Sequence, residues 1–143
     1  MKELNQMTLV FDARSVNESF ARVTAAAFLS QLDPTLQEIA EIKTIVSEAV
    51  TNCIVHAYPD ELGVITVRCR ILKGQTLDIV VKDKGIGISD IDQARKPMFT
   101  TGGTERSGMR LTIMESIMTN LDITSEPGKG TTVHMRRKLQ RRK

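Results

Sequence analysis

The sequence has few aromatic residues, with no tryptophan, one tyrosine and four phenylalanines among 143 residues. Aromatic platforms on which single-stranded nucleic-acid bases could stack are therefore scarce. The two cysteines, Cys53 and Cys69, do not form a Cys-x-x-Cys pair, and only two histidines are present. We therefore expect no zinc site, and we expect both thiols to be reduced and buried.

Long apolar runs are also missing. No stretch approaches the roughly 18 apolar residues of a membrane-spanning helix, and the N-terminal residues lack the apolar run of a secretory signal. These absences predict a cytoplasmic protein without membrane contact. Apolar residues make up 41% of the chain and charged residues 26%, which is ordinary for a globular protein, and 143 residues suit one domain.

Basic residues are concentrated at the C-terminus. The formal charge is +3, but six of the twenty lysines and arginines lie within residues 136–143, and the rest of the chain carries −3. We predict one domain over residues 1–135 and a basic tail over residues 136–143. A basic balance that arises from a tail does not indicate a nucleic-acid-binding domain, and we expect no direct nucleic-acid contact.

The first third of the chain has the periodicity of two helices. A strand at 7–12 precedes a helix that extends to about residue 32, and Ser15 to Glu18 has the form of a capping box. A longer helix is expected to begin with Asp33 as N-cap and Pro34 in its first turn. The apolar residues at helical spacing are Val16, Phe20, Val23 and Ala27 in the first helix, and Leu36, Ile39, Ile42, Val46, Ala49 and Cys53 in the second.

The remainder predicts strands arranged as hairpins. Runs at 64–72 and 76–82 form one hairpin, and strands near 121–125 and 131–136 follow a third helix at about 108–119. Residues 83–108 form a loop too long for a simple connection, which indicates function. The fold class is therefore α+β, a two-layer α/β sandwich with a mixed, mostly antiparallel sheet covered by helices on one face.

Two motifs carry side chains suited to nucleotide chemistry. Glu48 and Asn52 lie one helical turn apart, and a carboxylate can take a proton from a hydroxyl while an amide oxygen suits Mg²⁺. Asp83 can accept a hydrogen bond from the exocyclic amine of a base such as adenine, and Gly85 and Gly87 allow the backbone to approach a flat ligand. On its own, the spacing of Glu48 and Asn52 is more typical of a solvated helix face, and the segment from Asp83 to Gly87 is equally consistent with an ordinary turn.

Two further segments complete the set. Residues 104–109 precede a predicted helix, whose N-terminal N–H groups can bind phosphate while Arg106 neutralises a terminal phosphoryl group. An ordinary polar loop is the alternative. Residues 130–132, Gly-Thr-Thr, begin the last predicted strand.

The order of these motifs resembles the ATP-binding fold shared by gyrase, heat-shock protein 90, histidine kinases and the MutL proteins, often called the Bergerat fold. Residues 20–23, 41–52, 94–101 and 105–109 further resemble the sporulation anti-sigma F factors, and the resemblance covers nearly the whole chain. It implies a serine/threonine protein kinase that uses Mg-ATP to phosphorylate a serine of an anti-anti-sigma factor. It also implies inhibition of a sporulation sigma factor.

The resemblance implies a role for individual residues. Glu48 would be the general base, Arg106 would reach the γ-phosphate, Asn52 would be the Mg²⁺ ligand, and Arg22 would contact protein partners. The first strand and helix would form a homodimer contact. The residues implied to bind ATP or ADP are Asn52, Asp83, Gly85, Gly87, Thr100, Thr101, Ser107, Gly108, Met109 and Thr132.

Three features depart from the pattern of the family. Arg110 occupies a position where the phosphate loop usually has glycine, residues 101–105 are two residues shorter than usual, and Ala57 replaces a glycine. A nucleotide-binding anti-sigma module with weak or lost kinase activity is therefore one alternative. A general-stress anti-sigma kinase of the same fold is the other.

Overall fold

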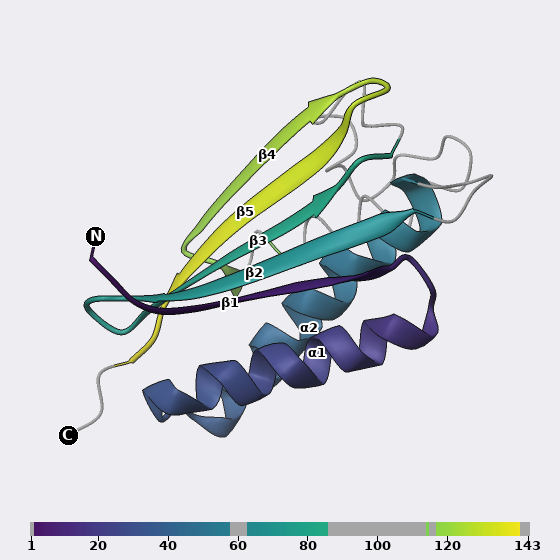
Figure 1. Cartoon of the computed structure of the whole chain (residues 1–143). Coiled ribbons are helices and arrows are strands. Elements are labelled where there is room, and N and C mark those ends of the chain that lie inside the picture. Colours follow the sequence, from purple (N-terminus) through teal and green to yellow (C-terminus); the bar gives the residue numbers. More distant parts are fainter. Residues whose placement is uncertain (1, 58–62, 86–113, 115–116, 141–143) are drawn as a thin grey trace.

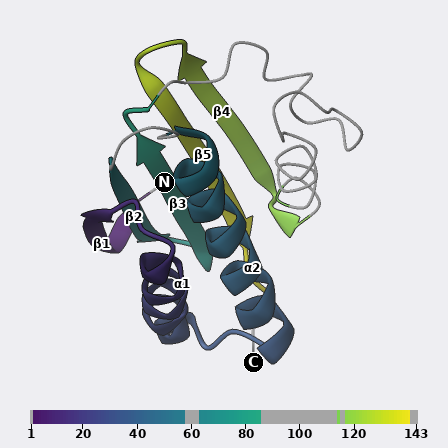
Figure 2. The ribbon, with the colours of Figure 1, turned by 90° about the vertical axis from the view of Figure 1, so that its right-hand side faces the viewer.

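The computed structural model describes residues 2–57, 63–85, 114 and 117–140. Within these residues, five strands form one sheet in the order β1-β2-β3-β5-β4, and two α-helices cover one of its faces (Figures 1 and 2). The strands are β1 (Glu3–Asp12), β2 (Val64–Leu72), β3 (Thr76–Asp83), β4 (Asn120–Glu126) and β5 (Gly130–Lys138). Neighbouring strands of this sheet are all antiparallel. The two-layer α+β architecture is confirmed, with no parallel pair in the described sheet.

The predicted hairpin of β2 and β3 is confirmed. Its turn contains Gly74 and Gln75 at positive φ, which reverses the chain within three residues. β1 begins four residues earlier than predicted. Of the third predicted helix, Met114 and Ile117 are described and helical, and the loop after Gly85 lies outside the described residues.

Helix α1 (Val16–Leu29) buries a face other than the predicted one. Its buried residues are Ala21, Ala25, Ala26 and Leu29, whereas Val16 is 73% exposed and Phe20 and Val23 are each 55% exposed. Small side chains let α1 pack closely against α2, which explains why the alanine face turns inward. The predicted capping box is also wrong, because Ser15 makes no side-chain cap hydrogen bond.

Helix α2 (Leu36–Asn52) begins two residues later than predicted. The N-cap is Thr35, and Thr35 and Glu38 form a reciprocal capping box, with N···O distances of 2.9 and 3.0 Å. Asp33 instead has a left-handed φ of 50° after the 3-10 turn Ser30–Leu32. The predicted apolar stripe holds from Ile42 onward, but Leu36 is exposed.

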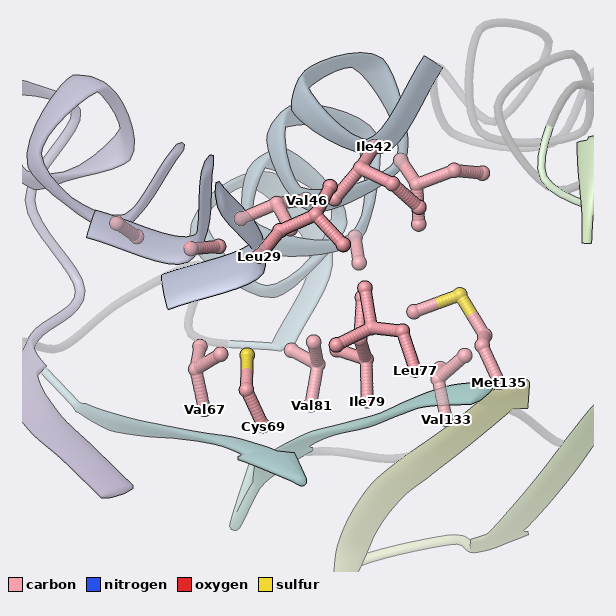
Figure 3. Close-up of a cluster of buried hydrophobic side chains, with 14 of the residues drawn as sticks. Leu29, Ile42, Val46, Val67, Cys69, Leu77, Ile79, Val81, Val133 and Met135 are labelled. Carbon is pink, nitrogen blue, oxygen red and sulfur yellow. The ribbon is translucent and has the colours of Figure 1, made fainter. Parts of the chain in front are cut away.

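The core lies between the two helices and one face of the sheet (Figure 3). Leu29, Ile42 and Val46 of the helices point toward the sheet. They pack over side chains of the central strands, which include Val67, Ile79 and Met135. Cys53 and Cys69 are both free and buried, as predicted. In the described part of the chain, no helix is long and apolar enough to cross a membrane.

Strand β5 extends to Lys138, so the predicted boundary between domain and tail falls inside a strand. The side chains of Arg136 and Arg137 reach Asp78 and Glu41, and Leu139 is 3% exposed. These partners, which are distant in sequence, hold residues 136–139 against the body of the protein. The first part of the basic segment therefore belongs to the fold.

Candidate functional site

Helix α2 positions two of the predicted functional side chains. Glu48 and Asn52 lie on its C-terminal half, and both are partly exposed. Immediately after Asn52 the chain continues as a π-helical turn, Cys53–Ala57, which contacts β3. Such wide turns are frequent at functional sites. The C-terminal end of α2 is thus fixed beside the end of β3.

Asp83, the last residue of β3, is 5% exposed. Its Oδ1 atom accepts two backbone hydrogen bonds, from the N–H of Gly85 at 2.9 Å and from the N–H of Thr131 at 3.2 Å. No lysine, arginine or histidine of the described residues forms an ion pair with this carboxylate. Asp83 is therefore held in one orientation by the backbone of two separate segments.

Gly130 is required for this arrangement. It has a φ of 104°, and a Cβ atom at this position would lie 2.2 Å from the carbonyl oxygen of Asp83 and 2.7 Å from the Cα of Lys84. Any side chain would push β5 away from the end of β3. The glycine thus permits the contact between Thr131 and Asp83.

The structure places Thr131, rather than the predicted Thr132, beside Asp83. Thr131 is 8% exposed, and its Oγ1 lies 2.8 Å from the Oγ of Ser125. Thr132 pairs with Lys82 and belongs to the opposite face of the sheet. The alternation with Val133 and Met135, both apolar, is the sequence signal that identifies Thr131 as the inward residue.

Cys53 is a neighbour of Asp83 that no sequence motif indicated. Burial, and next the negative charge of Asp83, raise the pKa of the Cys53 thiol well above its usual value, and the thiol donates a hydrogen bond to the carboxylate. Three elements therefore converge on Asp83: the end of α2, the end of β3 and the beginning of β5.

Arg22 lies on α1, far along the chain from this site. Its Nε is 3.4 Å from Glu18 Oε1, and its Nη2 donates to Ser19 Oγ at 3.3 Å. Phe20 and Val23, which are exposed, are close to Arg22 in sequence but lie on other sides of the helix. The other predicted site residues lie outside the described residues, namely Gly87, Thr100, Thr101, Arg106, Ser107, Gly108 and Met109.

This donor set fits a purine nucleotide with Mg²⁺. A buried carboxylate in a fixed orientation can accept a hydrogen bond from the exocyclic amine of adenine, and Gly85, whose N–H holds that carboxylate, has no side chain to obstruct a flat base. The Glu48 carboxylate and the Asn52 amide are hard oxygen donors on the helix that ends at this site.

Residues 10–137 match the histidine kinase-like ATPase domain family, the class of protein that this fold and site define. Relatives named anti-sigma F factor match nearly the entire chain. The one from Caldanaerobacter subterraneus subsp. tengcongensis is 51% identical over 142 residues, which is 99% of each chain. The one from Geobacillus stearothermophilus is 53% identical over 135 residues, 93% of this chain and 92% of that one. The chain belongs to the anti-sigma F factor family.

Solved structures of histidine kinases share the fold. The histidine kinase domain of the blue-light activated kinase EL346 from Erythrobacter litoralis superposes with a TM-score of 0.58 at 23% sequence identity, over 85% of this chain and 60% of that one. A second structure of this kinase gives a TM-score of 0.60 at 23% identity, over 82% of this chain. The present chain covers 40% of that second structure.

Proposed function

We propose that this protein is an anti-sigma factor that binds a sporulation sigma factor, sigma F, and phosphorylates a serine of an anti-anti-sigma factor with Mg-ATP. Identity of about half over nearly the whole length of anti-sigma F factors supports the partner class. The observation that carries the nucleotide site is the carboxylate of Asp83, which backbone groups hold and no cation of the described segments pairs. The protein would act in the cytoplasm, where sigma factors meet RNA polymerase.

In this proposal the adenine amine donates to Asp83, and Gly85 and Thr131 border the base. ATP and ADP would both bind there. The Asn52 amide oxygen would hold Mg²⁺, which supplies neutralisation of phosphate charge when bound. Arg106 would serve the γ-phosphate from the segment outside the described residues.

Glu48 would act on the incoming substrate. Its carboxylate would accept the proton of the serine hydroxyl as the oxygen attacks the γ-phosphorus of ATP, while the bond from that phosphorus to the bridging oxygen breaks and ADP leaves; this is the role of a general base. Position favours this role, because Glu48 lies one turn before Asn52 on the same helix face and is partly exposed to an approaching protein. Phosphoryl transfer depends mainly on positioning and charge neutralisation, so this small set of groups is sufficient.

The protein partners would bind at β1 and α1. β1 is an edge strand, and the exposed stripe of α1 consists of Val16, Phe20 and Val23. Apolar side chains of this size on one helix face mark a contact surface. We propose that this surface forms the homodimer and that Arg22, on another side of the same helix, contacts the sigma and anti-anti-sigma factors.

Intact-mass analysis of an anti-anti-sigma factor after incubation with this protein and Mg-ATP tests the kinase. We expect one added phosphoryl group, and no addition with Glu48→Gln, while this variant retains nucleotide and sigma-factor binding. Absence of phosphorylation by the wild type, with tight nucleotide and sigma-factor binding, would identify a nucleotide-gated sequestering protein instead. Arg110 in the phosphate loop is the feature that favours this second outcome.

Sedimentation analysis tests the proposed contact surface. Phe20→Ser is expected to convert a dimer to a folded monomer, with the fold checked by circular dichroism and any fall in melting temperature limited to the loss of subunit association. Leu36→Ser is the matched control, since Leu36 is 87% exposed on α2 and lies outside the proposed surface. If both variants remain dimeric, the α1 stripe is excluded as the dimer contact.

A further inference from the structure

A second cluster of charged side chains lies at the opposite end of the sheet from Asp83. Its centre is Arg137, whose side chain is 18% exposed and faces the helices, as Val133 and Met135 do. Arg137 Nη2 donates to Glu41 Oε1 at 2.9 Å, and Nη1 donates to the carbonyl oxygen of Ile117 at 2.8 Å. One guanidinium group therefore joins three segments of the chain, namely β5, α2 and the residues before β4.

The contact with α2 is on the functional face of this helix. Glu41 precedes Glu48 by seven residues and Asn52 by eleven, so the three side chains share one helix face. Arg137 thus holds α2 two turns before the proposed general base. Glu41 and Glu48 belong to one continuous helix, so a displacement of α2 at Glu41 would also displace Glu48.

The contact with Ile117 is at the end of a helical turn. The N–H of Met118 donates to the Met114 carbonyl oxygen at 3.0 Å. The carbonyl oxygen of Ile117, at the end of this turn, accepts its hydrogen bond from Arg137. Thr119 is bound to β5 by its own N–H, which donates to Arg136 O at 2.8 Å. In the chain, Met109, an implied phosphate-binding residue, precedes Met114 by only five residues.

The chain beyond Arg137 is also built into the fold. The N–H of Gln140 donates to Glu38 Oε2 at 2.9 Å, in the first turn of α2. Burial alone would raise the pKa of Glu38, but hydrogen bonds from Thr35 and Gln140 together with the charge of Arg137 lower it. The described end of the basic segment is therefore a strap across the start of α2.

We propose that Arg137 is a positioning residue for phosphoryl transfer. It fixes the spacing between the α2 face that carries Glu48 and Asn52 and the helical turn that follows the implied phosphate-binding segment. The planar guanidinium suits this task, since its fork serves two acceptors in fixed directions, whereas the lysine ammonium is a flexible point charge. This inference rests on the proposed kinase function.

Steady-state kinetics with Mg-ATP and an anti-anti-sigma factor tests the proposal with Arg137→Gln, Arg137→Lys and the matched control Lys138→Gln, which removes an exposed charge one residue later. We expect Arg137→Gln to lower kcat about tenfold with KM for Mg-ATP changed less than about twofold, because misplacement of reacting groups by an ångström has effects of this size or more. Arg137→Lys should give an intermediate kcat, and Lys138→Gln the wild-type value. Equal kcat for Arg137→Gln and Lys138→Gln overturns the proposal.

Two further measurements separate positioning from folding and from failure of the kinase assignment. If Arg137→Gln fails to fold, the folded Arg137→Lys variant decides, and a wild-type kcat in that variant overturns the proposal. If the wild type transfers no phosphate, the kinase assignment fails, and the affinity ratio of Mg-ATP to adenosine decides instead. A fall of about fivefold in this ratio for Arg137→Gln supports positioning at the phosphate end. An unchanged ratio, or no nucleotide binding by the wild type, overturns it.

Discussion

Strand β3 carries two buried carboxylates with different surroundings. Asp78 and Asp83 are five residues apart and therefore lie on opposite faces of the sheet. Asp78 is fully buried on the face without helices, and Asp83 is 5% exposed on the face beneath α2. Their partners differ in kind, because Asp78 is bound by cationic and polar side chains, whereas Asp83 is bound by neutral donors, namely two backbone N–H groups and the Cys53 thiol.

Asp78 is saturated by cationic and polar side chains. Arg70 Nη2 lies 2.9 Å from Oδ2, Arg136 Nε lies 2.7 Å from Oδ1, and His134 Nε2 also contacts Oδ1. Burial would raise the pKa of Asp78, but the hydrogen bonds from Arg136, His134 and Arg70 outweigh it and lower the pKa. This carboxylate has no acceptor capacity left for a ligand and serves to join β2, β3 and β5.

Asp83 has no such neutralisation among the described residues. A buried carboxylate without a cation is costly unless other donors satisfy it, and within the described segments the donors to Asp83 are neutral: two backbone N–H groups at Oδ1 and the Cys53 thiol. Both carboxylates are buried, so the kind of partner distinguishes them. Neutral donors fix the orientation of Asp83 without neutralising the charge that a ligand amine would meet in the proposed site.

Replacement of Asp83 should produce the largest effect. Asp83→Ala is expected to weaken ATP binding by about 100-fold or more. The variant loses the charged hydrogen bond to the base, and the backbone of Gly85 and Thr131 loses the carboxylate that holds it. Isothermal titration calorimetry measures the affinity, with Asp78→Ala as the comparison. ATP affinity reduced equally in both variants would remove the distinction between the two carboxylates.

Replacement of Asp78 should affect stability instead. Asp78→Ala leaves Arg70 and Arg136 without their carboxylate, and we expect the free energy of unfolding to fall by about 2 kcal/mol, discounted because these arginines are partly exposed. Urea denaturation gives this value. ATP affinity should stay within about twofold of the wild type.

Gly130→Ala is expected to have an intermediate effect. The added Cβ meets the backbone of Asp83, so we predict a stability loss of about 2 kcal/mol and ATP affinity reduced about tenfold. Gly128→Ala is the matched control, because Gly128 also has a positive φ of 80° but has no atom within 4 Å of the place that a Cβ would take. That control should lose only about 1 kcal/mol and retain ATP affinity.

Acid should produce the smallest effect, through Asp78. Because its folded-state pKa is lowered, Asp78 contributes stability above its unfolded-state pKa, and this contribution is lost as pH falls through the folded value. Between pH 5 and pH 2 we expect the wild type to lose about 1 kcal/mol more than Asp78→Ala does. Urea denaturation at several pH values measures this difference, and parallel curves for the two proteins would contradict it.

Local sequence patterns predicted much of the architecture. The alternation in β2, β3, β4 and β5 and the spacing of Glu48 and Asn52 on α2 are properties of neighbouring residues, and a period of two or 3.6 fixes which of them share a face. The order of the motifs indicated the family and the fold. The alternation in β5 also indicates that Thr131 faces inward with Val133 and Met135, although the family resemblance implied Thr132 as the binding residue.

Only the tertiary structure decided which side of α1 is buried and where the basic tail begins. The stripe of Val16, Phe20 and Val23 and the alanine stripe have the same helical period, and close packing against α2 selects the smaller side chains. Arg137 lies in a run of like charges, while its partner Glu41 is 96 residues away along the chain. A periodicity depends on residues that are close in the chain and can therefore be recognised in the sequence. A contact between residues far apart in the chain forms only when the helices pack on the sheet.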